Sequence, residues 1–291
     1  MNQKMLLFLR NVTVKIKLIP GSVVALALIR RYFIKKPLSI RVDNFDGDLS
    51  MNLSLNEHMQ SQIFWYGSYS RDVLSVLRNL LRPGMVVIDA GANIGEITLV
   101  AAKMVGASGR VYAFEPLLEL ADELSKNIGL NNFSQVYIQK YGLSDEAGDK
   151  EIYRASSDFY DGSEHEGLAT LYPSEKRGAK AGVIRLETLD SFCDRIDLKR
   201  LSLIKMDIEG AELPALRGGI GTLRRFMPYI IVEVQQETAN QAGYNAADIL
   251  ALLQPMGYRF DAIGRKGRLH PVDATSLGQF QNILCSPVER N

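Results

Sequence analysis

From Val86 onward, short runs of consecutive apolar residues alternate with segments in which apolar residues recur every three or four positions. A short apolar run predicts a buried strand, and the longer spacing predicts a helix packed along one side. The predicted strands are 86–89, 110–114, 136–140, 201–207, 229–234, 258–263 and 282–285, and the predicted helices are 95–105, 117–128, one from about 214, and 246–254. Strands that alternate with helices require a parallel sheet covered on both faces, so we predict an α/β fold with a seven-stranded, doubly wound sheet.

The first 70 residues follow other patterns, and we expect them to form an extension of the main domain. Residues 1–36 are basic and apolar and predict one or two short helices, broken at Pro20-Gly21. Residues 39–55 alternate between apolar and polar positions around Asp46-Gly47, which predicts a β-hairpin.

The main domain is expected to span residues 71–291, beginning with an amphipathic helix at Asp72–Leu81. Between its third and fourth strands lies an insertion, residues 147–200, rich in glycine, serine and charged residues. Insertions at this edge of a doubly wound sheet reach over the carboxyl ends of the strands. We therefore expect it to cover the substrate.

Composition narrows the classes of function. The chain has 291 residues, 46% of them hydrophobic, and a formal net charge of +1, so it lacks the strong positive charge of a nucleic-acid-binding protein. Its two cysteines, Cys193 and Cys285, have neither metal-ligand nor disulfide spacing. A reducing, cytoplasmic compartment fits this pattern, and nucleic acid is not an expected partner.

Basic residues are concentrated at the start of the chain, where nine precede the first acidic residue. No apolar run reaches the roughly 18 residues of a membrane span. Apolar residues flanked by Arg30-Arg31 and Lys35-Lys36 suit a helix lying on an anionic membrane surface, and equally a helix packed on the domain with solvated basic ends. Peripheral membrane contact through residues 1–36 is therefore one expectation.

The first strand of the main domain leads into a turn of small residues with the pattern Asp-x-Gly-x-Asn-x-Gly, formed by Asp89, Gly91, Asn93 and Gly95. Glycines let the backbone pass close to a ligand, and the N–H groups of the following helix face the same crevice. Asn93 stands where a dinucleotide fingerprint has its middle glycine, and asparagine tolerates left-handed backbone angles.

The second strand also ends in a carboxylate, Glu115, followed by Pro116. Glu115 lies 24 positions after Gly91 (115 − 91), about where an acidic residue accepts hydrogen bonds from a ribose diol. The turn and this carboxylate together predict a nucleoside site without deciding which nucleoside it binds.

Four motifs in this order resemble the FkbM family of S-adenosylmethionine-dependent methyltransferases. They are the 87–95 turn, Phe114-Glu115-Pro116, Leu189-Asp190, and the most specific one, the 204–212 run Ile-Lys-Met-Asp-Ile-Glu-Gly-Ala-Glu. The resemblance covers roughly residues 40–233. It implies a class I methyltransferase fold, S-adenosylmethionine as cofactor, and O-methylation of a hydroxyl, commonly on a sugar or polyketide.

The resemblance also implies cofactor contacts. Asp89 and the 91–95 backbone would surround the methionine part, Glu115 would hold the ribose, and residues after the third strand would contact adenine. The expected cofactor-binding residues are Asp89, Gly91, Ala92, Asn93, Gly95, Glu115, Pro116, Leu143, Ser144, Asp145 and Asp207. Structural roles compete with some of these, because Asp89 also fits a turn cap and Ser144-Asp145 a loop cap.

The candidate chemistry lies at the fourth strand, where Lys205, Asp207 and Glu209 share one face if strand geometry continues. Asp207 would orient the acceptor hydroxyl or take its proton. A buried Lys205 needs an acidic partner, with Asp207 or Glu233 as candidates. The same residues also fit a buried ion pair that orders the sheet edge, and Glu209 fits a cap of the next helix.

Glu233, at the end of the fifth strand, is a second candidate base, so the catalytic set is Asp207, Lys205, Glu209 and Glu233. The three carboxylates of this set would suit a hard cation, but no further ligand spacing supports a metal, and none is expected. His165, in the insertion, fits a general base or a solvated loop residue.

Taken together, these features predict an S-adenosylmethionine-dependent O-methyltransferase that modifies a hydroxyl of a sugar, glycan or related small molecule. One alternative is an oxidoreductase that binds a dinucleotide on the same type of sheet. A second alternative is a non-catalytic scaffold of this fold in polysaccharide assembly.

Overall fold

The computed structural model describes residues 3–16, 33, 38–154, 169–173 and 178–288. Within them, eight strands form the central sheet, in the order β13-β12-β14-β11-β10-β3-β4-β5. The bounds are β3 Val86–Ala90, β4 Arg110–Phe114, β5 Val136–Gln139, β10 Leu203–Met206, β11 Tyr229–Gln235, β12 Tyr258–Ile263, β13 Leu269–Pro271 and β14 Phe280–Pro287. The five strands from β11 to β5 are parallel, and β14 inserts antiparallel beside β11.

The predicted α/β fold with a doubly wound sheet is confirmed, with one difference in the number of strands. All seven predicted strands are present, and β13 adds an eighth at the edge next to β12. This short strand was missed because its three residues are all exposed, so it carries no apolar run.

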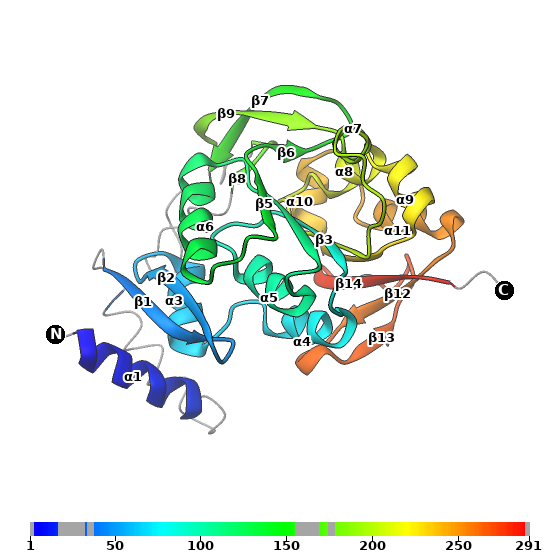
Figure 1. Cartoon of the computed structure of the whole chain (residues 1–291). Coiled ribbons are helices and arrows are strands. Elements are labelled where there is room, and N and C mark those ends of the chain that lie inside the picture. Colours follow the sequence, from blue (N-terminus) through cyan, green and yellow to red (C-terminus); the bar gives the residue numbers. More distant parts are fainter. Residues whose placement is uncertain (1–2, 17–32, 34–37, 155–168, 174–177, 289–291) are drawn as a thin grey trace.

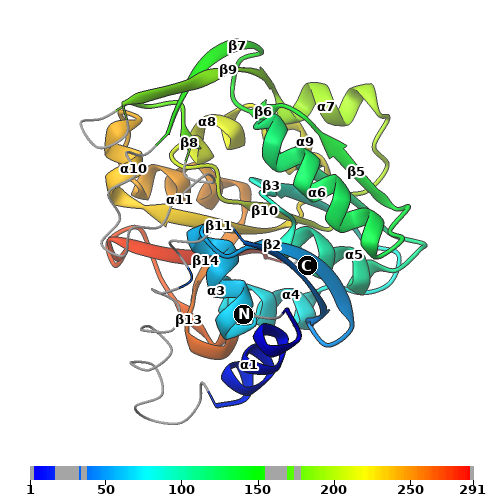
Figure 2. The ribbon, with the colours of Figure 1, turned by 90° about the vertical axis from the view of Figure 1, so that its left-hand side faces the viewer.

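Two helical layers enclose the sheet (Figures 1 and 2), because alternate residues of each strand face opposite sides. Val87, Val111 and Leu203 pack with one layer, whereas Ile88 and Ile204 pack with the other. The first layer holds α4 Arg71–Leu80, α5 Glu96–Val105 and α6 Leu118–Leu130. The second holds α7 Leu189–Arg195, α8 Glu212–Arg217, α9 Ile220–Phe226, α10 Gln236–Gln241 and α11 Ala247–Leu253, and short 3₁₀ turns follow at Gln254–Met256 and Arg265–Gly267.

Three strands of the predicted insertion and β6, which precedes it, form a second, four-stranded sheet in the order β6-β9-β7-β8, which we call the covering sheet. Its strands are β6 Gly142–Leu143, β7 Gly148–Arg154, β8 Ala169–Thr170 and β9 Ala179–Glu187. It stands above the central sheet in Figure 1, beyond the carboxyl ends of β3, β4 and β10. His165 lies outside the described residues.

The predicted hairpin is present as β1 Ser39–Phe45 and β2 Leu49–Ser54, with the turn at Asp46-Gly47. Side-chain amides of α6 hold its second strand: the N–H groups of Ser50 and Asn52 donate to Asn131 and Asn127, both at 2.8 Å. Hairpin residues share one hydrophobic cluster with α4 and α5, so the extension packs into the main core. The division at residues 70 and 71 stays a prediction.

Among the described residues of the N-terminal part, two further helices are α1 Gln3–Ile16 and α3 His58–Tyr66. Leu6 of α1 and Phe64 of α3 lie in the same buried cluster. The second predicted helix, after Pro20-Gly21, lies outside the described residues. Across the part of the chain that the structure describes, no helix combines the length and apolar character needed to cross a membrane.

Candidate active site

The turn after β3, residues 91–95, adopts the strained backbone that its sequence predicts. Gly91, Asn93 and Gly95 have φ angles of +79°, +49° and +103°, all in the left-handed region. A Cβ on Gly91 would lie 1.9 Å from the carbonyl oxygen of Asp207, so only glycine fits there. The turn after β3 and the loop after β10 therefore touch through their backbones.

Glu115, at the end of β4, reaches back to this turn. Its carboxylate accepts hydrogen bonds from the N–H groups of Asn93, at 2.9 Å, and Leu117, at 3.0 Å. Burial raises the pKa of Glu115 to about 7, against the opposing effect of these two donors. The Glu115 carboxylate is thus held in place by the turn and titrates near neutral pH. It also lies at the border of two hollows, which are described next.

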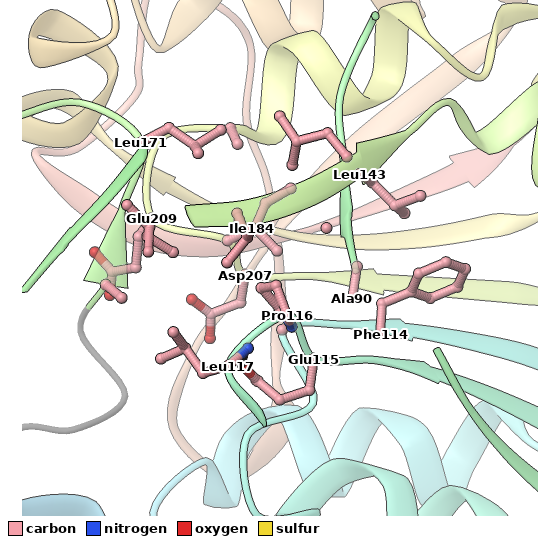
Figure 3. Close-up of a pocket in the computed structure, with 17 residues that line it drawn as sticks. Ala90, Phe114, Glu115, Pro116, Leu117, Leu143, Leu171, Ile184, Asp207 and Glu209 are labelled. Carbon is pink, nitrogen blue, oxygen red and sulfur yellow. Dashed lines mark hydrogen bonds between the residues drawn. The ribbon is translucent and has the colours of Figure 1, made fainter. Parts of the chain in front are cut away.

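The first hollow, which we call the apolar cavity, has a volume of about 590 Å³. Figure 3 shows Leu143 and Ile184 of the covering sheet facing Phe114 and Pro116 of the central domain across it. A flat apolar space with a carboxylate at its edge suits an aromatic base that carries a polar sugar.

The second hollow, which we call the acidic hollow, has a volume of about 1130 Å³. Carboxylates dominate its polar wall, and they are Glu57, Glu96, Glu115, Asp207, Glu209 and Glu233. The two hollows share Gly91, Glu115, Asp207 and Glu209, so they meet at the carboxyl ends of β3, β4 and β10.

Lys205, buried on β10, is the cation at the base of the acidic hollow. Its Nζ lies 3.7 Å from Asp89 and 3.5 Å from Asp207, and it donates to the carbonyl oxygen of Gly91 at 3.2 Å. Burial alone lowers the pKa of Lys205, but Asp207, Asp89 and Glu233 raise it above its ordinary value, so the lysine stays charged. Of the two acidic partners that the sequence suggested for Lys205, Asp207 forms an ion pair with it. Asp89 is a further ion-pair partner, which the sequence did not suggest.

Asp89 is fully buried on β3, directly opposite Lys205 in the parallel register. Its Oδ2 accepts a hydrogen bond from the Thr98 hydroxyl at 2.6 Å, whereas its Oδ1 has no hydrogen-bond donor. Burial raises the pKa of Asp89. Asp89 therefore depends on the charge of Lys205 to remain ionised.

Asp207, Glu209 and Glu233 form what we call the carboxylate cluster, with oxygens that all lie within 4.8 Å of one another. Burial, followed by the charges of Asp207 and Glu209, raises the pKa of Glu233 far above its usual range, and a hydrogen bond to Asp207 adds to this. Glu233 thus carries a proton beside an acceptor oxygen of Asp207. Among the described residues this is the group whose oxygens could surround a hard cation.

Glu209 itself adopts a left-handed φ of +54° in the loop after β10. Its carbonyl oxygen accepts a hydrogen bond from the Thr170 hydroxyl of the covering sheet at 2.7 Å. The capping role considered for Glu209 is not seen, because the N-cap of α8 is Ala211 and no side chain caps that helix. Glu212, the first residue of α8, instead accepts hydrogen bonds from the loop N–H groups of Ile208 and Gly210 at 2.8 and 2.9 Å.

The three residues expected near adenine are not brought together. Leu143 lines the apolar cavity, but Ser144 and Asp145 line a different hollow, with Tyr172. The Ser144 N–H donates to the carbonyl oxygen of Glu187 at 3.1 Å, which extends the pairing of β6 with β9 and carries the chain away from Glu115. Adenine contacts from Ser144 and Asp145 stay predictions without support from this geometry.

Sequence reasoning missed eight residues that line the acidic hollow, among them Glu57, Tyr69, Glu96 and Phe280. Glu96 looked like an ordinary acidic residue in the first turn of a helix. Trp65, in α3 before Tyr69, is a fully buried core residue and does not reach the hollow.

A family model for the methyltransferase FkbM domain matches residues 89–260, more than half of the chain. The chain is 27% identical over 236 residues to the AMB antimetabolite synthetase AmbE of Pseudomonas aeruginosa, covering 72% of this chain and 11% of that protein. It is 29% identical over 150 residues to Methyltransferase 1 of Beauveria bassiana, covering 45% of this chain and 57% of that one.

A third relative is the hexuronic acid methyltransferase AglP of Haloferax volcanii, 25% identical over 185 residues, which cover 63% of this chain and 67% of that protein. The chain spans about a tenth of the Pseudomonas relative and little more than half of the Beauveria relative.

The matched segment begins at Asp89 and contains the turn after β3, Glu115 and the whole carboxylate cluster. For this domain the match confirms the enzyme class, a methyltransferase of the class I fold, and S-adenosylmethionine as its cofactor. It argues against the dinucleotide oxidoreductase considered from the sequence. The chain belongs to the family of FkbM methyltransferase domains.

Proposed function

We propose that this chain is an S-adenosylmethionine-dependent O-methyltransferase whose acceptor is a hydroxyl of a sugar, a glycan or a related small molecule. The observation that carries the proposal is the junction of the two hollows at Glu115 and Asp207. One hollow has the apolar walls that a base needs, and the other has the negative charge that favours a cation.

The residues present fit the cofactor. In this proposal Glu115 holds the ribose diol at the edge of the apolar cavity, next to Pro116. The backbone of residues 91–95, anchored by Asp89, faces the methionine part. When bound, S-adenosylmethionine supplies a methyl group on a positively charged sulfur. The charges of Asp207 and Glu209, which line both hollows, favour that positive charge.

The carboxylate cluster is placed to handle the acceptor. Asp207 lies at the carboxyl end of β10, where it would take the proton of the acceptor hydroxyl onto a carboxylate oxygen as the methyl carbon exchanges its bond to sulfur for a bond to the acceptor oxygen. Lys205, 3.5 Å away, keeps Asp207 oriented. Glu209 and protonated Glu233 bind neighbouring hydroxyls, which hold the reacting oxygen in line.

The sugar class of the acceptor rests on one relative. AglP of Haloferax volcanii is named a hexuronic acid methyltransferase, and its aligned region spans two thirds of its length. From this relative we take only the class of acceptor, a sugar. The carboxylate-rich wall of the acidic hollow also supports it, because carboxylates accept hydrogen bonds from several hydroxyls at once.

Two measurements test this function. Isothermal titration should show binding of S-adenosylhomocysteine and no binding of reduced nicotinamide dinucleotide. Labelled methyl transfer is then screened over nucleotide sugars, simple glycosides and glycan extracts. Asp207→Asn should retain S-adenosylhomocysteine binding and lose methyl transfer, whereas Asp122→Asn, which changes an exposed partner of Lys140, should retain both. Failure to bind S-adenosylhomocysteine would overturn the proposal.

For location we propose the cytoplasm, with peripheral contact to the inner membrane face through residues 1–36. Helix α1 supports this, because Met5, Phe8 and Val12 are exposed on it at helical spacing. Deleting residues 1–36 should move the protein from the bound to the free fraction when it is sedimented with anionic vesicles. Unchanged sedimentation would remove the membrane contact and leave the enzymatic proposal intact.

A further inference from the structure

Tyr69 lies in the short connection between α3 and α4 and lines the acidic hollow. Tyr69 is 47% exposed, so part of this large aromatic residue is open to the hollow. Among the exposed large hydrophobic residues of the described chain, only Tyr69 and Phe280 line this hollow. An aromatic face left open beside a row of carboxylates is what a sugar ring requires, since it has one apolar face and several hydroxyls.

A buried carboxylate fixes the position of Tyr69. Glu96, only 4% exposed, accepts hydrogen bonds from the N–H groups of Tyr69, at 2.6 Å, and Ser70, at 2.9 Å. Burial raises the pKa of Glu96, although the two N–H donors act to lower it. Burying a carboxylate to hold a surface loop costs stability, so the arrangement points to a need for this loop at one fixed place.

Glu96 also ties the loop to the cofactor side of the site. It is the first residue of α5, immediately after the turn formed by residues 91–95. The backbone of Tyr69 is therefore anchored to the same turn that faces the cofactor, without an intervening mobile segment. Tyr69 keeps a fixed relation to the place where methyl transfer occurs.

Tyr69 and the carboxylate cluster line the same hollow. Burial, followed by the charges of Asp207, Glu233 and Glu209, raises the pKa of Tyr69, so the hydroxyl stays protonated and can donate a hydrogen bond. An acceptor ring seated against Tyr69 would thus have its hydroxyls between the phenol and the cluster.

Phe280 reaches the same hollow from the C-terminal part of the chain, at the start of β14. It pairs with Gln235 of β11, two residues beyond Glu233, and it is 58% exposed. Segments that are far apart in the sequence therefore each bring one open aromatic ring to the same hollow.

The charge of the hollow limits the acceptor. Among the described residues that line it, Lys205 is the cation, and it already faces Asp89 and Asp207. Apart from Tyr69, the other ionisable lining residues are carboxylates. Glu233 holds a proton, so the negative charge of the hollow comes from the others. A ring carrying its own carboxylate would meet repulsion there, whereas a neutral or amino-bearing ring would not.

We propose that Tyr69, held in place by Glu96, is the acceptor-positioning residue of this enzyme, and that its subsite takes a neutral or amino sugar rather than an acidic one. This inference rests on the function proposed above. Tyr69 contacts the acceptor directly, whereas Glu96 acts through Tyr69 and is a positioning residue.

The first experiment separates charge from ring shape. Methyl transfer is measured with the methyl glycosides of the neutral hexose, the hexosamine and the hexuronic acid in the gluco, galacto and manno series. In whichever of these three series the enzyme methylates, kcat/KM for the neutral or amino member should exceed kcat/KM for the uronic acid at least tenfold. Equal or faster transfer to the uronic acid would overturn the charge preference.

The second experiment tests the two residues. Tyr69→Ala should raise the KM for the acceptor tenfold or more and leave the Kd for S-adenosylhomocysteine within twofold. Tyr69→Phe retains the ring and should fall between this variant and the wild type. The matched control is Tyr137→Ala, since Tyr137 is 43% exposed on β5 and lies outside both hollows. It should leave the acceptor KM unchanged.

Glu96 is tested by rescue. Glu96→Ala should raise the acceptor KM as Tyr69→Ala does, and Glu96→Gln, which retains one acceptor oxygen, should restore part of it. An unchanged KM in Tyr69→Ala would overturn the role of Tyr69 and leave the methyltransferase itself established. No transfer to any glycoside despite S-adenosylhomocysteine binding would overturn the sugar acceptor and this inference with it.

Discussion

The apolar cavity and the acidic hollow meet at Glu115, yet they are built from different parts of the chain. The covering sheet supplies Leu143 and Ile184 to the apolar cavity. The acidic hollow takes Glu57 and Tyr69 from the N-terminal half and Glu233 from β11. The residues that both hollows share directly follow β3, β4 and β10 of the central sheet or lie in the loop after β10.

This difference shows how one sheet serves two ligands of opposite character. The shared residues follow β3, β4 and β10, the strands on which any ligand at this crevice must rest. The walls above them come from an insertion on one side and from the N-terminal loop on the other. Changes in either wall should therefore alter one ligand, and a change that displaces the shared backbone at Gly91 should alter both.

The largest effect is expected for Gly91→Ala, which would break the shared floor. The new Cβ would lie 1.9 Å from the Asp207 carbonyl oxygen, at a φ of +79°. Left-handed strain and overpacking against backbone together should cost about 5 kcal/mol. Urea unfolding should show this loss, and titration should show no S-adenosylhomocysteine binding by the protein that remains folded.

The matched control is Gly129→Ala in α6. A Cβ there meets nothing within 4 Å, and the helical position favours alanine. We expect a stabilisation of about 0.5 to 1 kcal/mol and unchanged binding. If Gly91→Ala bound S-adenosylhomocysteine normally and lost only acceptor turnover, the two hollows would not share a floor.

Much of this floor was predictable from sequence, because local patterns determine it. The β3 strand is a continuous apolar run, and the left-handed positions after it hold two glycines and an asparagine. The ribose-binding role predicted for Glu115 followed from its separation from Gly91 in the sequence. The covering sheet was predicted only as an insertion, since β7 has four exposed residues in succession and carries no apolar signal.

The acidic hollow was only half predictable, for a different physical reason. Asp207, Glu209 and Glu233 stand at the ends of predicted strands, so sheet topology brings them together. The link between Glu96 and Tyr69 spans 27 positions and depends on a buried hydrogen bond. No periodicity marks such a contact, and the same holds for Phe280, which β14 carries to the hollow from the C-terminal end.

Lys205→Met should sharpen the comparison, because Lys205 lines the acidic hollow and not the apolar cavity. The change leaves Asp89 buried without a cation and should destabilise the protein by about 3 kcal/mol at pH 7. Burial already raises the pKa of Asp89, and without the lysine the folded state would hold a proton there that the unfolded chain releases. The loss should therefore grow as pH rises above about 4 and shrink as pH falls.

Unfolding of Lys205→Met at several pH values measures how its loss of stability changes with pH. The control is Lys180→Met, which removes the exposed partner of Glu151 on the covering sheet and should leave stability unchanged. A pH-independent loss in Lys205→Met would mean that packing, and not the charge of Asp89, accounts for it.

The smallest effect is expected from pH alone, acting on Glu115, one of the three carboxylates that line both hollows. Burial raises the pKa of Glu115 to about 7, so the ionised form that accepts hydrogen bonds from a ribose diol disappears as pH falls through that value. If only this form binds, the Kd for S-adenosylhomocysteine should rise about tenfold between pH 8 and pH 6. Glu115→Gln should bind more weakly at pH 8 and show a flat profile. A wild-type profile as flat as that of the variant would separate Glu115 from the ribose, and the border between the two hollows would then need another residue.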